Sequence, residues 1–195
     1  MRFQSTSQIS ILKNDFQLDY AVLQMGQNSI ITKKICLLGN FSVGKTSMIA
    51  RFVRHTFSEK YLTTVGVKID SKPIELADGL TLKLIVWDIA GSDKYSGIDT
   101  TYITGSAGIL FVVDGMRKET LDAIVGLRRC VNESVGDCAM VCAINKSDLK
   151  IKWEITRADI DGLIESGIPT FKTSAKTGEN VEAAFASLAK LLIET

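Results

Sequence analysis

The chain has 195 residues, of which 46% are hydrophobic and 23% are charged, and its formal net charge is +1. This length allows one domain with a substantial core. The near-zero charge excludes bulk attraction to nucleic acid or to an anionic membrane, so any bound polyanion must be held locally. The four cysteines form no CxxC pair, and we therefore expect a cytoplasmic protein with reduced thiols.

Two regions differ in character along the chain. Residues 1–32 open with the polar run QSTSQIS and show no clean helical or strand period. We interpret them as a flexible N-terminal extension, with a functional arm as the alternative. Residues 33–195 have the patterns of one folded domain. The final residues LLIET contain no cysteine, so we expect no C-terminal prenyl group and no stable lipid anchor.

From residue 33 onward, short apolar runs alternate with segments of helical periodicity. Strands are predicted over residues 34–39, 68–76, 80–88, 107–114, 138–145 and 168–173. Helices are predicted over residues 46–53, 118–131, 156–167 and 179–192. The turn residues Ala77-Asp78-Gly79 predict an antiparallel hairpin between the second and third strands. The order predicts an α/β domain whose six-stranded, mostly parallel sheet has helices on both faces and its ligand at the carboxyl ends of the strands.

A glycine-rich loop with the pattern Gly-x-x-x-x-Gly-Lys-Thr follows the first predicted strand and precedes the first predicted helix. Such a loop turns backbone N–H groups toward phosphate oxygens, at a helix N-terminus that favours negative charge. Lys45 can reach the β- and γ-phosphates, and Thr46 offers a hydroxyl to Mg²⁺. A chance match is roughly a one-in-a-hundred event in a chain this long. The predicted phosphate-binding residues are Gly39, Asn40, Phe41, Ser42, Val43, Gly44, Lys45, Thr46 and Ser47.

The run Asn145-Lys146-Ser147-Asp148 at the end of the fifth predicted strand indicates which base is bound. A carboxylate such as Asp148 can accept both the ring N–H and the exocyclic amine of guanine, whereas adenine offers no such pair of donors. Asn145 can meet the purine N7, and the stem of Lys146 can cover the base plane. The run alone also resembles an ordinary polar turn, and its position after the phosphate loop is what favours guanine.

Three further segments fit the same ligand. Asp88 ends the strand after the hairpin and can hold Mg²⁺ through water, while the Gly91 N–H can sense a γ-phosphate. Thr64, between the first helix and the second strand, can complete the Mg²⁺ shell from a mobile loop. Ser174-Ala175-Lys176 follow the last strand and can offer a backbone N–H to the guanine O6.

These five elements, in this order and spacing, resemble the small GTPases of the Ras superfamily, and the Rab branch most closely. The segments RFVRHTFSEKYLTTVGVKI, LKLIVWDIAG and TSAKTGENVEAAF are similar to Rab segments. The resemblance covers about residue 33 to the C-terminus. It implies GTP/GDP and Mg²⁺ as ligands, Phe57 beside the base, Thr64 in the first switch and Gly91 in the second. It also implies effectors, an exchange factor and an activating protein that read the switches of a monomer.

The sequence departs from the family at the residue that orients the attacking water. The family has Gly then Gln in the second switch, whereas this chain has Gly91-Ser92. With Ser92 as an atypical member, the predicted catalytic residues are Lys45, Thr64, Gly91 and Ser92. The resemblance also implies that Phe41 stands beside the γ-phosphate, where the family commonly has a small residue. We therefore expect slow GTP hydrolysis, unless another group such as Asp93 or a partner residue positions the water.

Three functions are compatible with these patterns. The first is a cycling guanine-nucleotide switch that hydrolyses GTP slowly, and the second is a persistent GTP-bound scaffold. The third, an ATP-using P-loop protein, is disfavoured by Asp148. A Ser-His-Asp hydrolase is disfavoured, because its triad would depend on His55, the lone histidine. Nucleic-acid binding is also disfavoured, because neither tryptophan has the basic or aromatic surroundings of a stacking site. We expect a cytoplasmic protein that partners recruit to membranes.

Overall fold

The computed structural model describes residues 29–58, 63–76, 79–91, 99–149, 151 and 153–194. Within them, six strands form one sheet: β1 (Ile30–Leu38), β2 (Val67–Glu75), β3 (Thr81–Ile89), β4 (Gly108–Asp114), β5 (Ala139–Asn145) and β6 (Thr170–Lys172). Five helices accompany it: α2 (Lys45–Arg54), α3 (Thr100–Ile103), α4 (Lys118–Ser134), α5 (Arg157–Glu165) and α6 (Val181–Glu194).

The strand order is β2-β3-β1-β4-β5-β6. Only β2 and β3 pair in antiparallel register, and the other neighbouring strands of this described sheet are parallel. This arrangement confirms the prediction of a mostly parallel sheet with one hairpin. The central strand β4 is buried at every residue, as expected for a strand that is covered on both faces.

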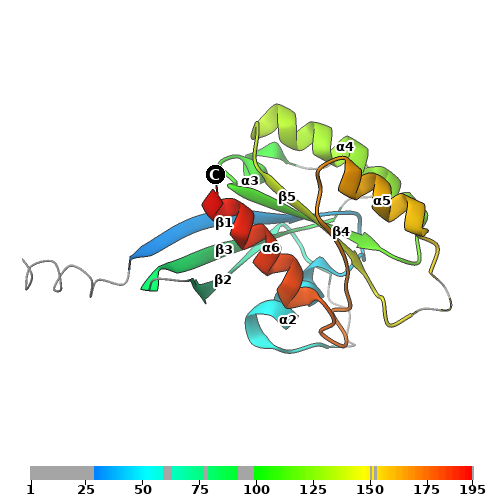
Figure 1. Cartoon of the computed structure of the whole chain (residues 1–195), viewed down its shortest axis with the longest axis horizontal. Helices are drawn as coiled ribbons and strands as arrows, with labels where there is room; N and C mark the ends of the chain where they lie inside the picture. The colour runs from blue at the N-terminus through cyan, green and yellow to red at the C-terminus, as the bar shows by residue number, and fades with distance from the viewer. Residues whose placement is uncertain are drawn as a thin grey trace, which may run out of the picture.

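Helices cover both faces of the sheet (Figure 1), and an apolar layer holds them on each face. Alternate residues of β1 point to opposite faces, so Ile35 and Leu37 pack with α2 and α6, whereas Cys36 and Leu38 pack with α3, α4 and α5. The ring of Phe52 in α2 is stacked on that of Phe185 in α6, with centroids 3.8 Å apart. These layers fix the β1–α2 loop at the carboxyl edge of the sheet.

The two largest differences from the sequence predictions are the start of β1 and a short helix. Strand β1 begins at Ile30, because its first residues pair with β3 from Ile30↔Thr81 onward. Residues 30–32, which the prediction assigned to the extension, therefore belong to the sheet, while residues 1–28 lie outside the described part. The short helix α3 was not predicted, since four residues are too few to show a helical period. The predicted hairpin residues Ala77 and Asp78 also lie outside the described residues.

Candidate nucleotide-binding site

The β1–α2 loop has the conformation that its glycines allow. Gly39 and Gly44 have φ values of 152° and 103°, which L side chains rarely adopt. A Cβ on Gly39 would lie 2.1 Å from the Val112 carbonyl oxygen, and one on Gly44 would lie 2.3 Å from the Asn145 side-chain nitrogen. Both positions therefore require glycine. Helix α2 begins directly after Gly44, so the loop lies at a helix N-terminus.

Lys45 is nearly buried and its ammonium lies across the loop. Its Nζ donates to the carbonyl oxygens of Gly39 at 2.7 Å and Asn40 at 3.0 Å. A Cβ on Gly91 would lie 2.6 Å from both this ammonium and the Asn40 carbonyl oxygen. The predicted second-switch glycine is thus in direct contact with the phosphate loop, and the close approach explains why position 91 carries no side chain.

The three predicted metal residues come together at the start of α2. Thr46 Oγ1 donates to Asp88 Oδ2 at 2.6 Å, Thr64 Oγ1 donates to the same oxygen at 3.3 Å, and the two hydroxyl oxygens are 2.7 Å apart. Asp88 is 1% exposed, and its Oδ1 has no hydrogen-bond partner within the described chain. Burial raises the pKa of the Asp88 carboxyl, although the Thr46 hydroxyl and the Lys45 charge lower it.

This donor set fits Mg²⁺. Hydroxyl and carboxylate oxygens are its preferred ligands, together with water and phosphate oxygens. A buried carboxylate with one unpartnered oxygen is unfavourable without a nearby cation. The fit therefore rests on the unpartnered Asp88 Oδ1 as well as on the two hydroxyls that donate to Oδ2 of the same carboxylate.

Asn145 ties together the loops on the predicted base side. Its side-chain amide donates to the Val43 carbonyl at 2.9 Å and accepts from the Ala175 N–H at 3.0 Å. The amide is 2% exposed, so these contacts are shielded from water. Asp148 is held in turn, because Ser174 Oγ donates to its Oδ1 at 2.5 Å. The base-side segments are thus connected to one another and to the phosphate loop.

A cleft of about 530 Å³ opens at this edge of the sheet. The predicted site residues that line it are Phe41, Ser42, Gly44, Lys45, Thr46, Ser47, Phe57, Thr64, Gly91, Asn145, Lys146, Asp148, Ala175 and Lys176. The predicted site residues that do not line it are Gly39, Asn40, Val43, Asp88 and Ser174. Ser92 lies outside the described residues.

The sequence prediction missed several residues that shape the site. Arg54 and Lys68 also line the cleft, and both form ion pairs with Asp70. Arg51 of α2 donates through Nε to the Ala175 carbonyl at 2.9 Å and also donates to the Lys176 carbonyl. Asp114, which ends β4, receives hydrogen bonds from Arg117 and Lys146. Its place at the carboxyl end of a parallel strand was the sequence signal that could have identified it.

The fold and the site together define a P-loop nucleotide-binding domain, with a glycine loop between β1 and α2 and a cleft along the carboxyl ends of the strands. The family model described as the Ras family matches residues 34–194. The chain therefore belongs to the Ras family. Of the described helices, none has both the length and the apolarity needed to span a bilayer.

Curated relatives place the chain near the Rab proteins. Ras-related protein SEC4 of Saccharomyces cerevisiae is 35% identical over 164 residues, which cover 83% of this chain and 75% of that protein. Ras-related protein Rab-13 of Mesocricetus auratus is 34% identical over 159 residues, covering 80% and 78% of the two chains. Ras-related protein Rab-8B of Homo sapiens is 35% identical over 159 residues, covering 80% and 76%. The chain is thus a Rab-like small GTPase of the GTP-binding switch class.

Proposed function

We propose that this protein binds GTP and GDP with Mg²⁺ and acts as a guanine-nucleotide-dependent molecular switch. The observation that carries the proposal is the meeting of Thr46 and Thr64, from different segments, at the buried carboxylate of Asp88. Thr64 precedes an exposed stretch, since the Val65 side chain is 90% exposed. A contact made by Thr64 only in one nucleotide state would couple the bound ligand to that surface.

Each side chain has a distinct role in the proposed site. The backbone N–H groups of the β1–α2 loop hold the phosphates, and the Lys45 ammonium exchanges its carbonyl contacts for phosphate oxygens. Thr46 and Thr64 would hold Mg²⁺ directly and Asp88 through water. The metal, when bound, supplies positive charge that neutralises charge developing on the β- and γ-phosphates. Gly91 offers its N–H beside Lys45.

Guanine selectivity is assigned to Asp148. The Ser174 hydroxyl holds one carboxylate oxygen and thereby orients the side chain at the cleft wall. The carboxylate would accept two donors from guanine. Adenine offers no such pair of donors, and the missing contacts would cost about 1–3 kcal/mol. A competition titration with GTP and ATP tests the assignment, and comparable affinities for the two nucleotides would refute it. The nucleotide released on denaturing the purified protein gives an independent identification.

We further propose that GTP hydrolysis is slow. The Ser92 side chain is too short to bridge the attacking water and the γ-phosphate as a Gln amide does. Phe41 is 37% exposed and lines the cleft, where its ring would obstruct an inserted arginine. Such an arginine is worth about 10³–10⁵ in rate where it acts. The second candidate function is a persistent GTP-bound scaffold. It is favoured if Ser92 and Phe41 together abolish GTP turnover.

Single-turnover hydrolysis separates these possibilities. The parent, Ser92→Gln, Phe41→Gly and the double variant are each loaded with GTP, and the rate is followed with and without a Rab-type activating protein. We expect the double variant to be the fastest and to respond most to the activating protein. A parent that turns over as fast as the double variant refutes slow hydrolysis, whereas undetectable turnover in the parent identifies the scaffold.

The proposed partners are effectors, an exchange factor and an activating protein of the kind that Rab proteins use in vesicle trafficking. These partners would recruit the protein from the cytoplasm to membranes. The exposed Val65 and Ile69 beside Thr64 offer an apolar contact surface for them. Binding partners retained by the GTP-loaded and not the GDP-loaded protein would support this role. Val65→Asp should abolish such retention without changing nucleotide affinity, and unaltered retention would contradict the surface assignment.

A further inference from the structure

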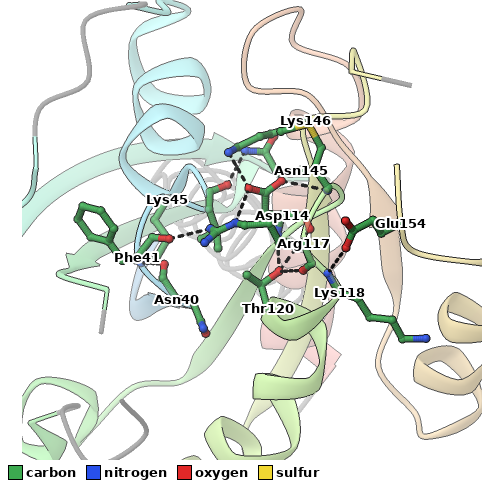
Figure 2. A network of polar contacts seen from close by, with 12 residues as sticks. Asn40, Phe41, Lys45, Asp114, Arg117, Lys118, Thr120, Asn145, Lys146 and Glu154 are labelled. Atoms are coloured by element: carbon green, nitrogen blue, oxygen red, sulfur yellow. Dashed lines mark hydrogen bonds and ion pairs between the residues drawn. The ribbon is translucent and has the colours of Figure 1, made fainter. Parts of the chain in front are cut away.

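Arg117 lies between the β4–α4 turn and the phosphate loop (Figure 2). Its guanidinium NH2 group donates to the Phe41 carbonyl at 2.8 Å, a contact between residues 76 positions apart. The same guanidinium donates through Nε to Asp114 Oδ2 at 3.0 Å. One planar fork therefore joins the loop backbone to a carboxylate that is 1% exposed.

Further hydrogen bonds hold the arginine and its partner carboxylate in place. Asp114 also accepts from the Lys146 ammonium at 2.7 Å, so the carboxylate stays paired if either cation is lost. The Arg117 backbone N–H donates to the Asp114 carbonyl, and its own carbonyl accepts from the Thr120 hydroxyl at 2.7 Å. Arg117 is not among the residues that line the cleft. Its contact with the phosphate loop is the hydrogen bond to the carbonyl of the Phe41–Ser42 peptide.

That peptide has a defined orientation. A trans peptide directs its C=O and the following N–H to opposite sides. With the Phe41 carbonyl directed at Arg117, the Ser42 N–H is directed away from Arg117. Ser42 itself lines the cleft. Ser42 has a φ of 64°, an uncommon conformation for a residue other than glycine. A flip of this peptide would relieve that conformation and turn the N–H out of the cleft.

We propose that Arg117 is a positioning residue that holds the Phe41–Ser42 peptide with its N–H directed at the bound phosphates. The inference rests on the proposed nucleotide site and adds a determinant of nucleotide residence time. Asp114 shares its carboxylate between Arg117 on the phosphate side and Lys146 on the base side. The same carboxylate therefore orients both halves of the cleft.

The test is the dissociation rate of a fluorescent GDP analogue, chased with excess GDP in the presence of Mg²⁺. Arg117→Ala should release it about tenfold faster than the parent, which corresponds to about 1.4 kcal/mol. Arg117→Lys keeps a charge beside Asp114 but loses the planar fork, and it should release at least about threefold faster. Arg157→Ala is the matched control, because Arg157 pairs with Asp161 on the exposed surface of α5. Its rate should equal that of the parent.

Ser42→Gly supplies a readout that a general structural role would not change. Glycine adopts the positive φ without strain, so the orientation of the Phe41–Ser42 peptide depends less on Arg117. In the Ser42→Gly background, Arg117→Ala should therefore raise the dissociation rate only about threefold. A tenfold effect that persists in the Ser42→Gly background would overturn the proposal, as would parent-like rates for Arg117→Ala and Arg117→Lys. A parent that fails to bind the analogue would instead refute the proposed function and this inference with it.

Discussion

Replacing Asn145 by alanine tests whether the loops of the site form one cooperative unit. The amide is 2% exposed and bridges the Val43 carbonyl and the Ala175 N–H at 2.9 and 3.0 Å. Alanine removes both hydrogen bonds and leaves a buried acceptor and a buried donor without a partner. Each unsatisfied buried group costs about 1–3 kcal/mol. Because the loops can relax partly toward water, we expect a loss of about 2–4 kcal/mol in the free energy of unfolding.

Urea unfolding of the nucleotide-free protein measures this loss directly. A loss near 3 kcal/mol should lower the midpoint of thermal unfolding by about 6–12 °C in a domain of this size. Asn132→Ala is the matched control, since Asn132 is exposed on α4 and should change stability by about 0.5 kcal/mol or less. A loss below about 1 kcal/mol for Asn145→Ala would mean that the two backbone groups find other partners, and the bridge would then have no structural importance.

Three further outcomes follow from the site and from α5. Asp148→Asn should weaken GTP binding and admit xanthine nucleotides, whose ring carries a carbonyl at the edge that Asp148 would contact. A competition titration in which guanine stays preferred would contradict the role of Asp148. In Mg²⁺-free protein the raised pKa of Asp88 means that the folded state binds the proton more tightly, so stability should fall as pH rises from about 4. Asp88→Asn should flatten that slope in urea unfolding, and parallel curves would refute the assignment. Thr156→Ala removes the N-cap hydroxyl that accepts from the Asp159 N–H and should cost about 1 kcal/mol, with an unchanged unfolding midpoint as the contrary result.

Short-range patterns were sufficient for most of the fold. The apolar runs of β1, β4 and β5 and the helical periods of α4 and α6 depend on residues close in sequence, so their existence could be predicted from the chain alone. The same holds for the phosphate loop, where Gly39, Gly44 and Lys45 have a fixed spacing. Periodicity is weakest at element ends, and so the pattern predicts a start at residue 34, whereas β1 begins at Ile30.

The site required the tertiary structure. The sequence predicts Thr46, Thr64 and Asp88 as Mg²⁺ residues, but it does not predict the hydrogen bonds among them. Those bonds, and the Asp88 oxygen that they leave without a partner, depend on how the sheet places β3 and α2. Arg117 carried no sequence signal, because its contact with Phe41 exists only where the strand order sets β1 beside β4. Local sequence determines which backbone conformations are favourable, whereas contacts between distant loops depend on the order and twist of the strands that carry them.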